Sequence, residues 1–153
     1  LSIKKSRKGS VGCINATKNN AIGEFNNNTT FGIKGEINNI NLSNYKKYKV
    51  ASINEVKLGK AQIILQNKNN VCKKYDIEII NIEHQKKADS KGIKIKITDP
   101  LLLKETGGIV QGMSGTPIIQ DNKIVGGARA VVKSNKRIGV MTNIDYMIKN
   151  CNK

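Results

Sequence analysis

The clearest pattern in the sequence is the alternation of apolar and polar positions in two neighbouring segments. Gly92–Thr98 alternates isoleucine with lysine, and Lys73–Ile82 alternates tyrosine or isoleucine with acidic residues along much of its length. A period of two places every second side chain on one face, which predicts two half-buried β-strands. The polar segment Gln85–Lys91 predicts a bend that separates them.

Shorter segments rich in Ile, Val and Thr, with polar or glycine residues between them, predict further strands. They are Val11–Asn15, Thr30–Lys34, Lys49–Lys57 and Ala61–Gln66. The segment Leu58–Lys60 is short enough for a tight connection, in which Gly59 can take a positive φ.

The C-terminal third predicts two antiparallel pairs of strands. Asp121–Asn122 between two apolar runs is a hairpin signature, and a second pair is expected on either side of Ser134–Asn135. Two short helices are also expected. One begins with Asp99 as N-cap and Pro100 at the first helical position and ends at glycine, and the other covers Asn143–Asn150.

Strands do not alternate with long helices, which favours a mainly β protein, an antiparallel barrel or sandwich. With 153 residues, the chain fits one domain with a modest core. It opens on Leu1, carries no signal peptide and has no apolar run approaching the roughly 20 residues of a membrane helix. We therefore expect residues 1–153 to be a single fragment of a longer protein, incomplete at its N-terminus.

The net charge of +16 invites a nucleic-acid or anionic-membrane partner. The lysines are spread along the chain with many asparagines and isoleucines, and few aromatic side chains are interleaved to stack on bases. We therefore expect no specific nucleic-acid partner and only weak attraction to anionic membrane surfaces. Cys13, Cys72 and Cys151 have no metal-binding spacing, so no metal or cofactor is expected, and at least one thiol is free unless it pairs with another chain.

Ser114 lies in the run Gly112-Met113-Ser114-Gly115-Thr116-Pro117. A serine hydroxyl attacks well only when a tight loop exposes it beside a base and oxyanion donors. The two glycines give the loop backbone freedom, and the N–H groups of Gly112 and Ser114 could converge on one oxygen. The alternative is an ordinary Gly/Ser turn between strands.

A longer stretch carries a resemblance to a known family. Thr98–Gly126 is similar almost residue for residue to the core of the sporulation SpoIVB peptidases, and weaker similarity reaches Lys4–Gly12, Gly32–Gly35 and Tyr75–Ile82. The resemblance implies a chymotrypsin-like double β-barrel, partial in this chain, and a Ser-His-Asp mechanism. It makes Ser114 the nucleophile and Asp99 the acidic member, with Gly112 and Ser114 forming the oxyanion hole. The competing role for Asp99 is that of a helix cap.

The general base is missing from this pattern. The one histidine, His84, matches no catalytic position of the family, whose histidine segment would fall before Leu1. Either the base has been removed or this relative never had it. A Ser-Lys dyad needs a desolvated lysine, and none sits in an apolar stretch near Ser114. The run Gly127–Val132 also departs from the family pattern, so we expect an altered cleft near Ser114. Because the histidine base is missing, we expect the fragment to be inactive.

The resemblance implies a secreted sporulation signalling endopeptidase that cleaves itself and cuts a membrane-associated regulatory protein, which triggers processing of a late sigma factor. It also implies a parent protein anchored in the membrane at its N-terminus, with a PDZ domain upstream, secreted across the forespore membrane into the space between the two cells. The missing base motivates a second hypothesis, a non-catalytic peptidase fold that binds a peptide or partner. A third hypothesis, a basic nucleic-acid or membrane binder, predicts binding that falls steeply with salt.

Overall fold

The two alternating segments form neighbouring strands of a closed β-barrel. β7 (Cys72–Ile82) and β8 (Ile93–Ile97) pair antiparallel, with Ile77 opposite Ile97 and Ile79 opposite Ile95. This computed structural model describes residues 1–17, 20–38, 40–83 and 92–149. His84, the predicted bend at Gln85–Lys91 and Cys151 lie outside the described residues.

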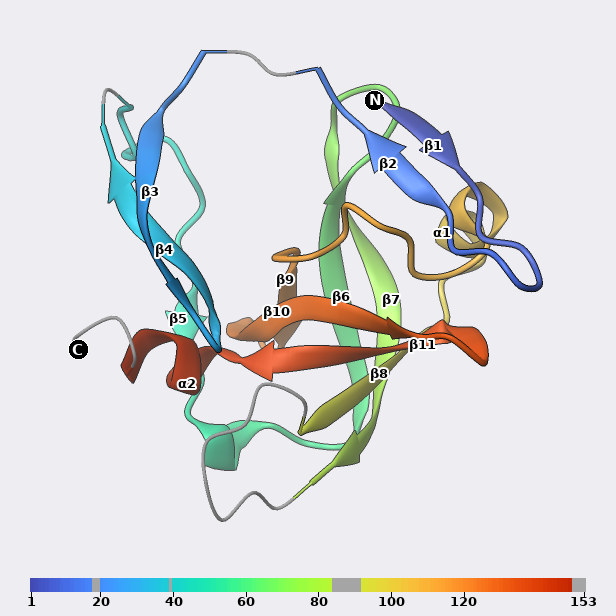
Figure 1. Ribbon diagram of the computed structural model, residues 1–153. Coiled ribbons are helices and arrows are strands. Elements are labelled where there is room, and N and C mark those ends of the chain that lie inside the picture. The colour runs from blue at the N-terminus through green and yellow to red at the C-terminus, as the bar shows by residue number, and fades with distance from the viewer. Residues whose placement is uncertain (18–19, 39, 84–91, 150–153) are drawn as a thin grey trace.

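The barrel closes because its last two strands pair with each other as well as with their other neighbours. Its antiparallel order is β11-β8-β7-β6-β9-β10, and β10 then pairs with β11 (Figure 1). The remaining barrel strands are β6 (Gly59–Gln66), β9 (Pro117–Gln120), β10 (Lys123–Val132) and β11 (Asn135–Asn143). β5 (Lys49–Val50) adds in parallel to β10. The predicted antiparallel barrel is confirmed.

Isoleucine fills the barrel, as the scarcity of aromatic residues requires. The inward positions of the two alternating strands are 5% exposed or less. The fully buried side chains include Ile63, Ile77, Ile79, Ile93, Ile95, Ile97, Leu102, Met113, Ile118, Val125 and Met141. Each such side chain contributes about 1.5–3 kcal/mol on burial, so this core is the main source of stability for the part of the chain that carries Ser114.

Both predicted hairpins are present. Asp121 and Asn122 have φ of 50° and 59°, the pair of positive values that a two-residue hairpin turn of type I′ needs. Lys133 and Ser134 connect β10 to β11. Gly59 does take a positive φ, of 112°, but it begins β6 and is not part of a tight connection.

The strand predicted over Lys49–Lys57 is wrong beyond Val50. A short 3-10 helix, η1 (Ile53–Glu55), replaces it. Ser52 and Glu55 favour this turn because the Ser52 N–H donates to the Glu55 carboxylate at 2.9 Å and the Glu55 N–H donates to the Ser52 carbonyl at 3.1 Å.

The first 38 residues form two separate two-stranded ribbons beside the barrel (Figure 1). β1 (Ser2–Lys4) pairs with β2 (Cys13–Asn15), and β3 (Gly23–Thr29) pairs with β4 (Gly32–Ile37). β1 and β3 were not predicted, and the asparagines in β3 explain this because asparagine has low β propensity.

Both predicted helices are confirmed as α1 (Pro100–Thr106) and α2 (Ile144–Lys149). The Asp99 carboxylate caps α1, and Gly107 ends it in the left-handed conformation at φ 69°. Within the described part of the chain, neither helix has the length and apolar character needed to cross a membrane.

Candidate active site

The loop that carries Ser114 connects α1 to β9 and is pinned to the barrel on both sides of the serine. Met113 is 1% exposed and packs in the core, and Thr116 is 8% exposed. Ser114 itself is exposed. The buried methionine therefore fixes the loop and turns the next side chain outward.

The backbone N–H groups of this loop fall into two sets. Those of Gln111, Met113, Gly115 and Thr116 donate to the carbonyls of Gly12, Val110, Ala128 and Met113 respectively, over 2.7–3.3 Å. Among the described residues, no acceptor pairs with the N–H of Gly112 or of Ser114. The two donors expected to form an oxyanion hole are therefore the two that the fold leaves uncommitted.

Gly112 is required at its position for two reasons. Its φ is 97°, and a Cβ there would lie 3.1 Å from the Cβ and carbonyl oxygen of Ile14. The β2 strand thus passes directly against the loop. The Ile14 N–H donates to the Gln111 carbonyl at 2.8 Å, which fixes this approach.

Ser6, which is 7% exposed, ties the N-terminal ribbon to the segment that leads into the loop. Its N–H donates to the Thr106 carbonyl at 2.7 Å, and its hydroxyl donates to the Ile109 carbonyl at 3.1 Å. The same hydroxyl accepts from the Gly12 N–H at 2.9 Å. Ser6 therefore sets the position of the chain that enters the serine loop.

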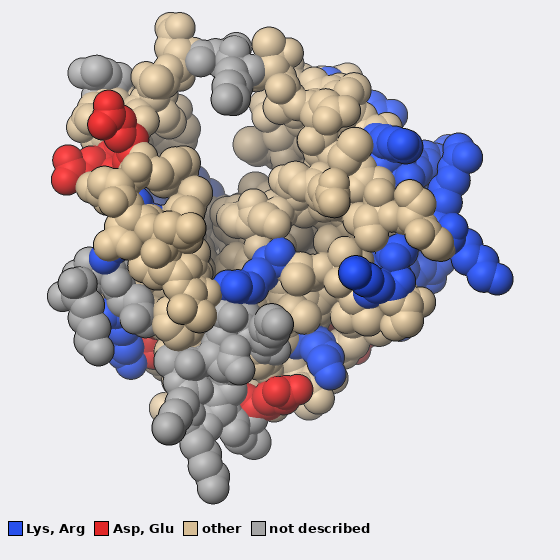
Figure 2. Space-filling model, in the orientation of Figure 1, with Lys and Arg blue, Asp and Glu red and all other residues tan. Residues whose placement is uncertain are grey.

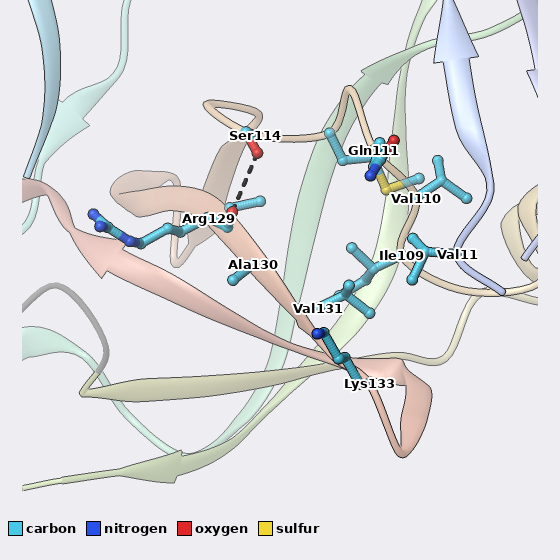
Figure 3. A pocket seen from close by; sticks show the side chains of 11 residues that line it. Val11, Ile109, Val110, Gln111, Ser114, Arg129, Ala130, Val131 and Lys133 are labelled. Carbon is cyan, nitrogen blue, oxygen red and sulfur yellow. Dashed lines mark hydrogen bonds between the residues drawn. The ribbon is translucent and has the colours of Figure 1, made fainter. Parts of the chain in front are cut away.

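The Ser114 hydroxyl donates to the backbone carbonyl of Arg129 at 3.1 Å (Figure 3). The Arg129 side chain points away from Ser114, and its guanidinium donates to the Thr30 carbonyl at 2.7 Å in the turn between β3 and β4. One residue of β10 thus contacts both the serine and the second ribbon. A carbonyl oxygen holds the hydroxyl in place but takes no proton from it at neutral pH.

Beside Ser114 lies a cavity of about 300 Å³. Its lining is mostly aliphatic, with Val11, Ile109 and Val110 facing Ala130 and Val131 across it (Figure 3). Lys133 lines the end of the cavity far from Ser114 in Figure 3 and is exposed to solvent. Its position gives no support to a Ser-Lys dyad.

Asp99 occupies the N-cap of α1, as one of its two predicted roles requires. One carboxylate oxygen accepts from the N–H groups of Leu101 and Leu102, both at 2.9 Å, and the other accepts from the Asp76 N–H at 3.3 Å. Burial raises the pKa of the neighbouring Tyr75 phenol, and the charges of Glu105 and Asp99 raise it further. Asp99 is not one of the described residues that line the cavity beside Ser114.

Sequence reasoning missed Arg129, Met113 and Ser6 as parts of this site. All three act through contacts with residues that are distant in the chain or through burial, and no local pattern marks them. The glycines around Ser114 did predict the bends of the serine loop from the sequence, because a positive φ depends on the local residue type. Gly112 and Gly115 do have φ of 97° and 83°.

The described structure is thus a closed antiparallel barrel that carries an exposed serine on a loop ahead of a hairpin. The family model for the SpoIVB peptidase S55 matches residues 1–148, so the chain belongs to the SpoIVB peptidase S55 family. The resemblance found from the sequence is confirmed.

Among solved structures, the chain is similar to the active form of the Rv3671c protease from M. tuberculosis. The two share 14% sequence identity with a TM-score of 0.49, over 69% of this chain. The chain spans about half of that protease chain, 47% of its length. No curated protein matches the sequence.

Proposed function

We propose that the chain is the peptidase region of a serine endopeptidase in which Ser114 attacks the scissile carbonyl. The observation that carries this proposal is the pair of uncommitted N–H groups at Gly112 and Ser114, on either side of a bonded Met113. Donors held in this way stabilise the oxyanion of a tetrahedral intermediate without reorganising. Gly112 and Ser114 are exposed, so a substrate oxygen can replace water as the acceptor of their N–H groups.

A peptide substrate has a place to bind beside the serine. Up to Gly127, one edge of β10 pairs with β9, and Ala128 then exchanges hydrogen bonds with Gly115 and Thr116. Beyond this point no described strand covers that edge, which lines the cavity through Arg129, Ala130 and Val131. An extended peptide adds to such an edge through main-chain hydrogen bonds.

The general base in this proposal comes from outside the described residues, as the family's histidine segment before Leu1 would provide. Asp99 would then orient that base, in addition to capping α1. Both oxygens of Asp99 already accept hydrogen bonds, and a carboxylate has the capacity for more. The chain by itself would be inactive, and the full-length protein active.

Family membership supports the finer function. In this proposal, the full-length protein is anchored at its N-terminus, acts after secretion across the forespore membrane, cleaves itself and cuts a membrane-associated sporulation regulator. The excess of basic residues would add weak attraction to anionic membrane surfaces.

The test is self-cleavage of the full-length protein that carries this chain. The purified protein should generate new N-termini over time, and Ser114→Ala should abolish them, because the hydroxyl that forms the acyl intermediate in this proposal is then missing. Ser2→Ala, a change in an exposed serine of β1, is the matched control and should cleave like the parent. Equal cleavage by the Ser114→Ala variant would refute the proposal.

A second function, a non-catalytic peptide-binding module, is favoured by one specific observation. Ser114 donates to a carbonyl, and the described residues place no general base beside it. In that case the edge of β10 would bind peptide, and the full-length protein would never release a cleaved product.

A further inference from the structure

Arginine is rare in this chain, and its placement is selective. Only three of the 27 basic residues are arginines, namely Arg7, Arg129 and Arg137. Arg129 lies beside Ser114, as described above. Arg7 and Arg137 come from opposite ends of the sequence, yet both line one cleft.

This cleft, of about 290 Å³, lies between the turn after β1 and the turn between β10 and β11. Its basic lining residues are Arg7, Lys8, Lys133, Lys136 and Arg137. Figure 2 shows Lys and Arg side chains gathered at the edge of the molecule where these turns and α1 lie in Figure 1. We call this the basic cleft.

Both walls of the basic cleft are fixed to the same short segment of backbone. On one side the Ser6 N–H donates to the Thr106 carbonyl, and on the other the Ile109 N–H donates to the Lys136 carbonyl, both at 2.7 Å. Gly107 lies between these two points and lines the cleft. These two hydrogen bonds therefore fix the distance between the two walls, and the basic residues on both walls surround the same space.

The cations of the basic cleft have no acidic partners within the described part of the chain. Its described lining contains no Asp or Glu, and the ion pairs of the described residues involve Lys94, Lys123 and Lys149. Like charges held around one space repel each other, so an anion bound there would be favoured. Arginine is well suited to such a partner because its planar fork pairs with a carboxylate through two hydrogen bonds.

The basic cleft lies next to the cavity beside Ser114, because Lys133 lines both. β10 connects them, running from Arg129, next to the serine, to Val132 at the turn. An antiparallel peptide on the open edge of β10 would therefore place the residues before its scissile bond along Arg129 to Lys133. Four residues of strand cover roughly 13 Å, so the fourth to sixth residues before the bond would reach the cleft.

We propose that the basic cleft is an exosite that binds an acidic side chain four to six residues before the scissile bond. The preferred substrates would then be peptides in which an acidic segment precedes an aliphatic residue, and that aliphatic residue enters the cavity beside Ser114. This inference rests on the proposed peptidase function for the direction of the peptide. Binding to the cleft itself needs no catalysis.

The test uses dodecapeptides of alanine and asparagine with one leucine, in which a single Glu or the neutral Gln occupies each position in turn. Binding is measured by fluorescence anisotropy to the full-length Ser114→Ala protein, and cleavage is measured with the parent. With the leucine as the first residue before the scissile bond, we expect Glu at one of the third to fifth positions before the leucine to bind about tenfold more tightly than Gln, as a charge-assisted pair allows. At the other positions of the peptide, the Glu and Gln peptides should bind with nearly equal affinity.

The matched variants reverse one charge each. Arg137→Glu lies in the cleft, and Lys47→Glu lies in the exposed segment between β4 and β5, which lines none of the cavities described above. Arg137→Glu should abolish the Glu-over-Gln ratio, and Lys47→Glu should preserve it. If the Glu-over-Gln binding ratio falls equally in both variants, the peptides respond to net charge alone and the proposal is overturned. A Glu-over-Gln ratio of one without either substitution would also overturn it.

The two proposals can fail separately. If the parent cleaves Glu and Gln peptides at equal rates, the exosite is refuted and the peptidase stands. If no peptide is cleaved but the position-specific preference in binding is present, the exosite stands and the peptidase function fails.

Discussion

The barrel and the β3–β4 ribbon are both built from antiparallel strands, yet they bury their side chains very differently. In the barrel, Ile95 and Ile118 are completely buried. In the ribbon, Phe25 is 76% exposed, Ile33 is 55% exposed and Ile37 is 61% exposed. The ribbon meets the remainder of the chain near its turn, where Thr30 accepts from Arg129 and the Phe31 ring lies 6.0 Å from that of Tyr146.

This difference shows which parts of the site the barrel supplies. The serine loop is anchored to the barrel by a buried methionine and by hydrogen bonds to β10, and to the β1–β2 ribbon by the hydrogen bonds of Gln111 with Gly12 and Ile14. The nucleophile and the two oxyanion donors therefore depend on the barrel and on that ribbon, and not on the β3–β4 ribbon. Nothing in the two ribbons, as far as they are described, adds a base to Ser114.

The largest expected effect compares the same substitution in the two regions. Ile118→Ala removes a side chain from the barrel core and should lower the free energy of unfolding by about 2–5 kcal/mol. Ile33→Ala in the ribbon should change it by less than about 0.5 kcal/mol, because that side chain is exposed. Urea unfolding followed by circular dichroism gives both values. Equal losses would mean that the ribbon belongs to the same core.

The next effect concerns the β1–β2 ribbon, which is joined to the barrel through α1. A Cβ at Gly107 would lie 2.4 Å from the Ser6 carbonyl oxygen, whereas a Cβ at Gly9 would meet nothing within 4 Å. Both glycines have positive φ, so Gly9→Ala should cost about 1–2 kcal/mol for the backbone alone. Gly107→Ala should cost clearly more in the same unfolding assay. A cost no greater than that of Gly9→Ala would show that the contact with Ser6 is easily given up.

Asp99 allows capping and charge to be separated. Asp99→Ala should destabilise the barrel by about 1 kcal/mol through the lost cap, and Asp99→Asn should retain most of that stability because asparagine also caps helices. Self-cleavage by the full-length Asp99→Asn protein should nevertheless fall if the carboxylate orients the base. Undiminished cleavage by that variant would leave Asp99 with the capping role alone.

The same Asp99→Asn variant has an optical readout. Asp99 is one of the charges that raise the pKa of Tyr75, so removing it should lower that pKa. Absorbance of the phenolate followed by alkaline titration measures the change. An unchanged titration would mean that burial and Glu105 account for the whole shift.

The smallest effect concerns the contact between the β3–β4 ribbon and β10. Arg129→Ala removes the hydrogen bond to Thr30, which is worth about 1 kcal/mol or less at an exposed site. The change should appear as faster amide hydrogen exchange in Gly23–Ile37, with little change in β6 or β7. Faster exchange throughout the barrel would contradict the separation of the two regions.

The sequence predicted most of the features that depend on local pattern. Alternating isoleucines indicated β7 and β8, Asp99 and Gly107 indicated the ends of α1, and glycines indicated the bends around Ser114. The failures came where contacts between distant residues decide the structure. Ser52 and Glu55 end β5 by capping each other, the asparagine-rich β3 depends on β4, and the role of Arg129 depends on a turn 99 residues away in sequence.

The measurement that tests the central claim most directly is labelling by a fluorophosphonate, which reacts only with an activated serine. The full-length protein is incubated with the reagent, digested and mapped by mass spectrometry, with a known serine protease as control. A phosphonate adduct on Ser114, absent from the Ser114→Ala protein, is the expected result. If the control protease reacts and Ser114 stays unmodified, Ser114 is not a nucleophile and the loop is a binding surface.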